Sequence, residues 1–158
     1  MEILTYPSTR LREEKEIVKN SEILTDSFRR KCWEMLRKME EAGGIGLAAN
    51  QVDWDARVFV MLNTDGKRRV IINPSYTPIT PLKHVVPEGC LSFPDEIRYI
   101  ERYKDIRILY SDLTGSTRHE IFTGLDAQIV QHETNHLDGI TLIDHGGEKF
   151  TRKSRTVL

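Results

Sequence analysis

The sequence predicts a single α+β domain spanning residues 1–158, in which antiparallel strands pack around a central metal-binding helix. Three observations predict it. Residues 25–41 carry apolar side chains at helical spacing, and several short β-prone runs separated by turn residues follow. A second helical pattern, near residues 126–138, carries two histidines four positions apart. No repeat or low-complexity stretch divides the sequence, so one core is expected.

The N-terminal residues, up to about 20, are expected to form an extended arm, because the residue before Pro7 disfavours helix. A helix then runs to about Glu41, with Thr25 or Asp26 as its N-cap. Its apolar face predicts a set of buried side chains: Phe28, Cys32, Met35, Leu36 and Met39. Cys32 is therefore interpreted as a small core residue.

Residues 44–51 form a run of small residues. Glycines at this density let a backbone approach a ligand closely and present its N–H and C=O groups to a peptide edge. The alternative is a tight turn between two elements.

Two strand pairs are predicted further along the chain. Residues 57–63 and 69–72 flank a turn, and residues 106–110 and 119–122 flank another. Between these pairs, four prolines predict a looping, edge-like region: Pro74, Pro78, Pro81 and Pro87.

The second helix carries the strongest chemical signal. Residues four apart lie on one face of a helix, so His132 and His136 can bind the same metal ion. Glu133 can reach a bound water without being a ligand. Asp126 is placed to act as the N-cap of this helix, and Gly139 as its left-handed C-terminal stop.

A tetrahedral site with one position open for water needs a third protein ligand. Cys90, within Glu88-Gly89-Cys90-Leu91-Ser92, is the best candidate. Four other residues compete for that role: His84, His119, His145 and Asp144. Spacing alone does not exclude His145 or Asp144, and a downstream histidine or carboxylate is typical of endopeptidases with this motif.

Composition sets limits on partners. Charged residues make up 30% of the chain and nearly cancel, leaving a formal net charge of -1, which argues against bulk binding to DNA or to a membrane surface. The longest apolar runs are strand-sized, and residues 1–4 lack the pattern of a signal peptide. We therefore expect a cytoplasmic monomer.

Three segments, residues 44–51, 88–92 and 131–136, together resemble the three signature motifs of the peptide deformylase family, in the right order. The resemblance implies a metal-dependent hydrolase that removes the formyl group from N-formylmethionine at the start of nascent polypeptides. It also implies one divalent metal ion, held by Cys90, His132 and His136. Iron(II) is the expected metal in the cell, with zinc(II) or nickel(II) able to substitute.

The same resemblance implies catalytic roles. A metal-bound water is the nucleophile, and Glu133 is the general base and later the general acid. The Gln51 side-chain amide and the Leu91 backbone N–H stabilise the oxyanion. Five residues are expected to line the groove for the substrate peptide: Gly44, Ile45, Gly46, Glu88 and Gly89. Of these, Ile45 is expected to help form the pocket for the methionine side chain.

The sequence departs from the family pattern in three places. Asn135 stands where the family usually has Asp facing an arginine, for which Arg102 is the candidate. Gln128 replaces a residue that is more often aliphatic, so a groove-facing side chain would make the methionine pocket more polar. Bacterial members commonly continue into a long helix that docks on the ribosome. Residues 145–158 are instead expected to form a flexible tail, similar to compact bacteriophage versions, with ribosomal RNA contact as the alternative.

Overall fold

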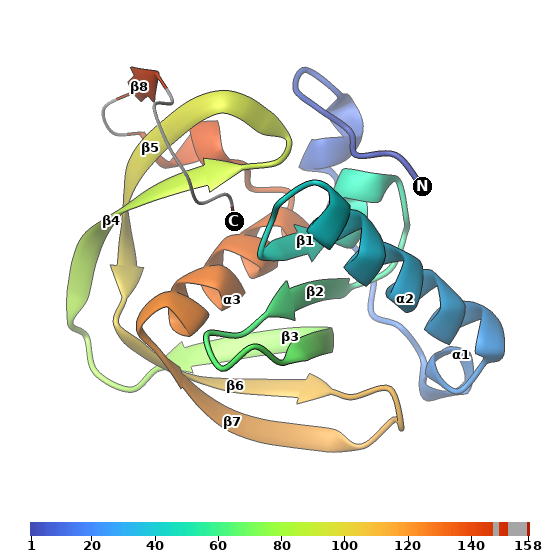
Figure 1. The fold of residues 1–158 in the computed structure, drawn as a ribbon. Helices are drawn as coiled ribbons and strands as arrows, with labels where there is room; N and C mark the ends of the chain where they lie inside the picture. The colour runs from blue at the N-terminus through green and yellow to red at the C-terminus, as the bar shows by residue number, and fades with distance from the viewer. Residues whose placement is uncertain (147–148, 152–157) are drawn as a thin grey trace.

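Helix α3 (Gly124–Leu137) lies at the centre of the molecule, between two antiparallel sheets (Figure 1). The computed structural model describes residues 1–146, 149–151 and 158. The predicted α+β fold class is confirmed. No helix in these described ranges is long and apolar enough to cross a membrane.

The larger sheet has the strand order β1-β2-β3-β6-β7, so β1 and β7 are its edge strands. Its five strands are β1 (Gly46–Ala48), β2 (Val58–Leu62), β3 (Arg68–Pro78), β6 (Asp105–Ser111) and β7 (Thr117–Thr123). The smaller sheet has the order β4-β5-β8. Its strands are β4 (Lys83–Cys90), β5 (Phe93–Tyr103) and β8 (Lys149–Thr151). Both predicted strand pairs, β2–β3 and β6–β7, are confirmed.

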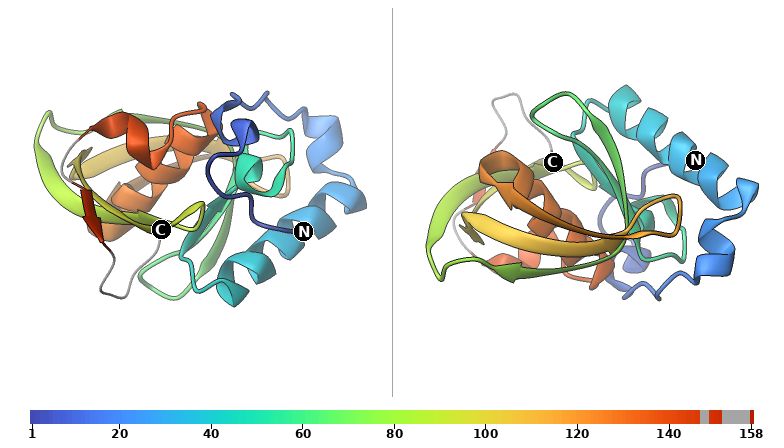
Figure 2. Two further views of the ribbon diagram at one scale, coloured as in Figure 1. Left: turned by 90° about the horizontal axis from the view of Figure 1, so that it is seen from above. Right: turned by 90° about the horizontal axis from the view of Figure 1, so that it is seen from below.

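Helix α2 (Asp26–Glu41) and α3 lie on opposite faces of the larger sheet (Figure 2). Thr25 caps α2 as predicted, since its hydroxyl oxygen accepts a hydrogen bond of 3.2 Å from the Phe28 N–H. All five apolar side chains predicted for its inner face are buried. The short helices are α1 (Asn20–Ile23), η1 (Thr9–Arg12), η2 (Ala49–Val52) and η3 (Leu142–His145), the last three being 3₁₀ turns.

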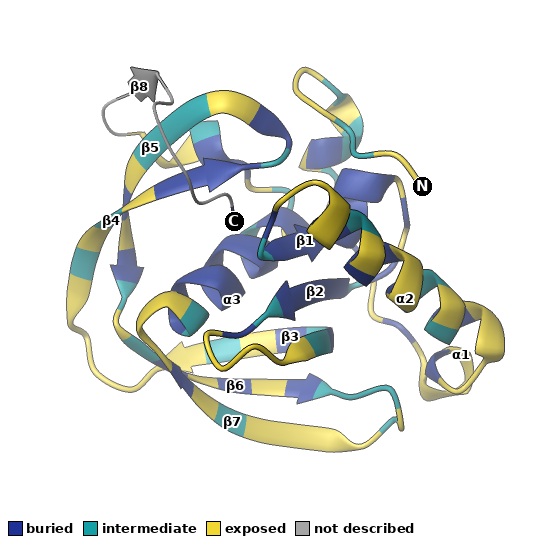
Figure 3. Cartoon of the chain, viewed as in Figure 1, coloured by how far each residue is buried: buried dark blue, intermediate teal, exposed yellow. Residues whose placement is uncertain are grey.

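Helix α3 is buried over most of its surface, which distinguishes it from α2 (Figure 3). From Ala127 to Leu137 every residue is buried except Asn135, which is half-buried. The helix ends at Leu137, and Gly139 has the positive φ of 71° expected for the left-handed stop. A helix buried in this way can hold polar side chains still, provided that each has a partner.

Asp126 is not the N-cap of α3, so that prediction is wrong. Strand β7 runs directly into the helix, and the cap position falls on Thr123. The Asp126 carboxylate instead accepts hydrogen bonds from the Thr64 N–H (2.9 Å) and hydroxyl (3.0 Å) in the β2–β3 turn. It therefore ties the first turn of α3 to that loop.

Most of the proline-rich region is strand and not loop, which is a second correction, although Pro81 lies in the short connection between β3 and β4 and the edge-like character is confirmed for β4. Strand β3 continues to Pro78, and β4 and β5 form a hairpin. A bulge absorbs the irregularity in β3, with Asn73 at a φ of 53° and a register shift between Ile72 and Ser75. Pro87 lies in β4, an edge strand, where a missing N–H is tolerated.

The tail predicted to be flexible contains elements that the structure places. His145 ends η3, and β8 pairs with β5 through Phe150 and Ile97. At these residues the structure shows regular elements where a flexible tail was expected. Residues 147–148 and 152–157 lie outside the described ranges, so flexibility there stays a prediction.

Candidate metal centre

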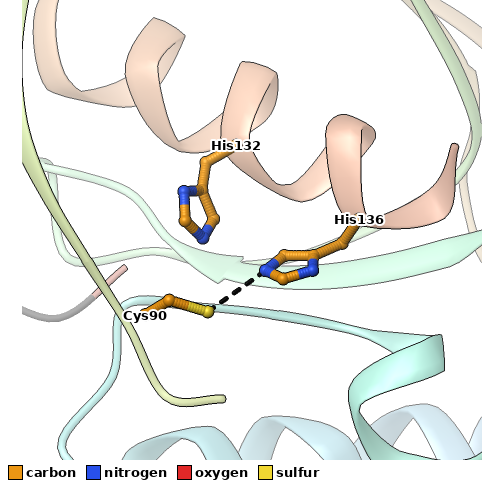
Figure 4. A group of neighbouring side chains, drawn as sticks. All are labelled: Cys90, His132 and His136. Carbon is orange, nitrogen blue, oxygen red and sulfur yellow. Dashed lines mark hydrogen bonds between the residues drawn. The ribbon is translucent and has the colours of Figure 1, made fainter. Parts of the chain in front are cut away.

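Three side chains that can bind a metal converge where the end of β4 meets α3 (Figure 4). Cys90 comes from β4, and His132 and His136 project from successive turns of α3. Their donor atoms all lie within 4.8 Å of one another, and all three residues are buried. The Cys90 Sγ lies 3.2 Å from the His136 Nε2. The structure thus brings together the three residues expected to bind the metal.

Two buried amides hold α3 in place. The Asn50 Nδ2 donates to the Leu11 carbonyl (3.1 Å) and to the His136 carbonyl (2.5 Å) at the end of the helix. The Gln131 side chain pairs with the Tyr103 backbone in both directions, accepting from its N–H and donating to its carbonyl at 2.9 Å each. These bonds fix α3 against η2 and β5. No role was predicted for either residue, although both lie within the motifs at residues 44–51 and 131–136.

Glu88 orients His132. The Glu88 Oε2 lies 2.8 Å from the His132 Nδ1, which leaves the His132 Nε2 for a metal. Arg102 donates two hydrogen bonds to the same carboxylate, at 2.7 and 2.8 Å. Burial alone would raise the pKa of Glu88, but the bonds from Arg102 and His132 outweigh it and hold the pKa at about 2.

The Glu88 side chain lies inside the site, and its expected place in the peptide groove stays a prediction. Glu88 is only 1% exposed, and its carboxylate is occupied by Arg102 and His132. Arg102 also donates to the Asn135 Oδ1 at 2.5 Å, which confirms the predicted contact between those two residues. Asn135 contributes an acceptor without a charge, so Glu88 is the carboxylate paired with Arg102.

Unpaired buried atoms show that the donor set fits a metal ion. The His132 Nε2 and both carboxylate oxygens of Glu133 are buried and have no hydrogen-bond partner among the described residues. Buried polar atoms are rarely left in this way, because each one costs free energy. A divalent cation bound to the three donors would satisfy the imidazole nitrogen and attract the nearby carboxylate.

Protonation states point the same way. Burial, reinforced by His132 and Arg102, lowers the pKa of His136 well below its usual value and favours the neutral imidazole that metals bind. Burial also raises the pKa of the Cys90 thiol, and the charges of Glu133 and Glu88 raise it further. A thiolate at this position therefore needs a nearby cation, and a coordinated metal supplies one.

Glu133 packs directly against β1. A Cβ atom built on Gly46 would collide with the Glu133 carboxylate, so only glycine leaves room for it. Burial, reinforced by the charge of Glu88, raises the pKa of Glu133 well above its usual value. Burial therefore favours the protonated form of this carboxyl group over the charged form.

Other residues of the first two motifs lie close to Cys90 and to one another. The Gln51 Oε1 accepts from the Ala48 N–H at 2.8 Å, and its Nε2 donates to the Ser92 hydroxyl at 3.1 Å and lies 3.6 Å from the Cys90 Sγ. Ser92, fully buried, had no predicted role. A Cβ on Gly44 would lie 2.8 Å from the end of the Leu91 side chain, so the first two motifs are in contact.

The competing third ligands do not join the site. The Asp144 carboxylate accepts from the Thr141 N–H and hydroxyl at 2.7 Å each and from Arg12 at 2.9 Å. His119 and His145 are exposed. Among the residues that the structure describes, Cys90 is the third side chain placed to bind a metal together with His132 and His136.

Gln128 is buried, and its Nε2 donates to the Pro87 carbonyl of β4 at 3.2 Å. Its amide is thus directed at the backbone of β4, which reduces the polarity that it can add to a pocket.

Comparison with known proteins agrees with this geometry. The model of the family described as polypeptide deformylase matches residues 1–152. A peptide deformylase of Rhodopseudomonas palustris (strain TIE-1) is 39% identical over 150 residues, covering 91% of this chain and 84% of that protein. The crystal structure of the Thermotoga maritima peptide deformylase is 34% identical, with a TM-score of 0.84 over 91% of this chain and 95% of the other. A Met-Ala-Ser-bound peptide deformylase of Acinetobacter baumannii is 28% identical, with a TM-score of 0.86 over 92% and 97%.

Proposed function

The chain belongs to the polypeptide deformylase family of metal-dependent hydrolases, and we propose that it removes the formyl group from N-formylmethionyl peptides of nascent chains. In this proposal, Cys90, His132 and His136 hold the metal ion that the reaction needs. The convergence of these three donors beside the unpaired Glu133 carboxylate carries the proposal. The proposed metal in the cell is iron(II), with zinc(II) or nickel(II) able to replace it. A divalent cation in this position supplies Lewis acidity and lowers the pKa of a water molecule bound to it.

Glu133 is the proposed general base and acid. Its carboxylate takes the proton of the attacking water and then delivers that proton to the amine that leaves the formyl carbon. A raised pKa suits the step in which Glu133 accepts a proton, because it makes the carboxylate a stronger base. Gly46 holds the carboxylate in position by leaving the room that a side chain would fill.

The Gln51 Nε2 and the Leu91 backbone N–H are the proposed donors to the oxyanion that forms at the formyl carbon. The position of the Gln51 Nε2, 3.6 Å from the Cys90 Sγ, supports its part in this role. Ser92 positions the same amide by accepting one of its hydrogen bonds.

We propose that the substrate peptide lies as an added strand between the backbones of residues 44–46 and Gly89, with Ile45 in the methionine pocket. Both β1 and β4 are edge strands of their sheets, so each can pair with a peptide. The relative from Acinetobacter baumannii was solved with Met-Ala-Ser bound, which supports a peptide site in this fold.

The decisive test is release of formate from a short N-formylmethionyl peptide by protein loaded anaerobically with iron(II) or nickel(II). We expect turnover in the wild type and none in Glu133→Gln at unchanged metal content. In Cys90→Ser we expect the metal itself to be lost. Cleavage of internal peptide bonds without formate release, with metal retained in Cys90→Ser, would instead support the endopeptidase alternative.

A further inference from the structure

Leu158 lies at the proposed substrate groove. Its side chain is only 2% exposed, and its backbone N–H donates to the Gly89 carbonyl at 3.3 Å. Gly89 immediately precedes Cys90, which is one of the three metal-binding candidates. In Figures 1 and 2 the C-terminus lies between the end of β4 and β1, over α3.

The side chain of Leu158 belongs to the main apolar cluster of the molecule. That cluster includes Leu47 of β1 and Ala127 and Val130 of α3, and Ile45 and Leu91 pack against it. Leu158 therefore combines a backbone bond to the edge of β4 with an apolar side chain that is buried from solvent. The proposed function gives a substrate the same kinds of interaction, namely backbone pairing of the peptide at Gly89 and an apolar pocket for the methionine side chain.

We propose that Leu158 occupies the subsite of the substrate methionine and makes the enzyme autoinhibited, with this residue of the same chain acting as a tethered competitor. The proposal rests on the function proposed above, because it needs the peptide groove to lie at Gly89. Leucine resembles methionine in size and lacks polar atoms, so it suits a pocket made for that side chain.

The short distance along the chain from β8 to Leu158 supports occupation of the methionine subsite by Leu158. Thr151 of β8 pairs with Glu96 of β5 in the sheet that contains β4. Leu158 is seven positions further along the chain, and seven residues span at most about 25 Å. Because Leu158 is covalently joined to β8, it stays near Gly89 even when its own contacts there are weak.

Competition by a tethered segment raises the KM for the substrate and leaves kcat unchanged, because saturating peptide displaces Leu158. The Leu158→Asp variant keeps the backbone N–H but replaces the apolar side chain with a charge that disfavours burial. We expect its KM to fall about threefold or more at the same kcat, and its affinity for the product Met-Ala-Ser to rise by the same factor.

Leu82→Asp is the matched control. Leu82 is 55% exposed and lies between β3 and β4, so the same substitution there should change neither KM nor product affinity. A second test avoids the folding of the variant. A synthetic peptide with the sequence of residues 149–158, added to Leu158→Asp, should inhibit competitively, whereas the same peptide ending in aspartate should not.

The outcomes separate this proposal from the one on which it rests. Equal KM and equal Met-Ala-Ser affinity in wild type and Leu158→Asp, with formate released by both, would overturn autoinhibition and leave the deformylase proposal intact. A higher KM in the variant would also overturn it, since Leu158 would then support the pocket. No formate from either metal-loaded protein would overturn the proposed function itself. If Leu158→Asp does not fold, Leu158→Ala replaces it, with a smaller fall in KM expected.

Discussion

At the scale of single residues, the position of Glu133 depends on the absence of a side chain at Gly46. A Cβ there would collide with the carboxylate. We predict that Gly46→Ala lowers kcat/KM for a formylmethionyl peptide by about 100-fold, because small displacements of a reacting group cost about that much. The metal content should not change, since none of the three donors is touched.

Gly44→Ala provides the comparison. Its Cβ would meet the end of the flexible Leu91 side chain at 2.8 Å, and that side chain can move. The loss should be well below that of Gly46→Ala. Equal losses in both variants would show that the backbone of this segment, and not the room beside Glu133, controls the rate.

The ion pair with Arg102 offsets the free-energy cost of burying the Glu88 carboxylate. Both side chains of the pair are at most 4% exposed. Removing one partner of a buried ion pair leaves the other unpaired, so we predict that Arg102→Ala lowers the free energy of unfolding by about 3 kcal/mol or more. Urea unfolding of the two proteins measures this difference.

Arg68→Ala is the matched control, because Arg68 also makes two hydrogen bonds to one glutamate, Glu40. That pair lies on the surface, where solvent screens it, so the loss should be far smaller. Similar losses in the two variants would mean that burial does not set the importance of Arg102.

At the scale of elements, most of the fold could be predicted wherever local chemistry decides the structure. Thr25 and the apolar face of α2, and the turns of the β2–β3 and β6–β7 hairpins, are local signals. The β4–β5 hairpin was missed because Pro78, Pro81 and Pro87 favour loops when the sequence is considered alone. Whether a proline is tolerated in a strand depends on which edge of which sheet it occupies, and that is settled by tertiary structure.

The turn between β6 and β7 is organised by one carboxylate. Asp112 accepts hydrogen bonds from the Thr114 hydroxyl (2.5 Å) and N–H (2.8 Å), the Ser116 N–H (3.2 Å) and the Arg118 Nε (2.6 Å). Burial opposes ionisation of Asp112, but these bonds outweigh it and lower its pKa from 3.8 to about 2.

The lowered pKa makes the stability contributed by Asp112 depend on pH. Because the folded-state pKa is below the unfolded value, that stability is fully present above about pH 4 and is lost as the pH falls toward 2. We predict that Asp112→Asn is less stable than wild type at pH 7 and that the difference shrinks below pH 4. Urea unfolding from pH 7 to pH 3 measures it, and a difference that does not change over this range would contradict the prediction.

At the scale of the whole molecule, the metal donors could be predicted, but much of what supports them could not. The spacing of His132 and His136 is a property of one helix, and Cys90 followed from a resemblance in its motif. The roles of Asn50, Gln131 and Glu88 depend on partners distant in sequence, such as His136 for Asn50 and Tyr103 for Gln131. Such contacts exist only once the chain has folded, so no local pattern marks them.

The three donors also come from different parts of the molecule. Cys90 ends β4 of the smaller sheet, and His132 and His136 belong to α3, which contacts β1 and β2 of the larger sheet. A metal bound only by the folded protein stabilises it, by about 4 kcal/mol at a free metal concentration 1,000 times its dissociation constant. We therefore predict that nickel(II) raises the thermal unfolding temperature of chelator-treated protein, and that Cys90→Ser loses most of this gain. Cys32→Ser, which changes the other buried cysteine, should unfold at a lower temperature but keep the gain. An undiminished gain in Cys90→Ser would mean that the metal does not join the two sheets and that its third ligand lies elsewhere.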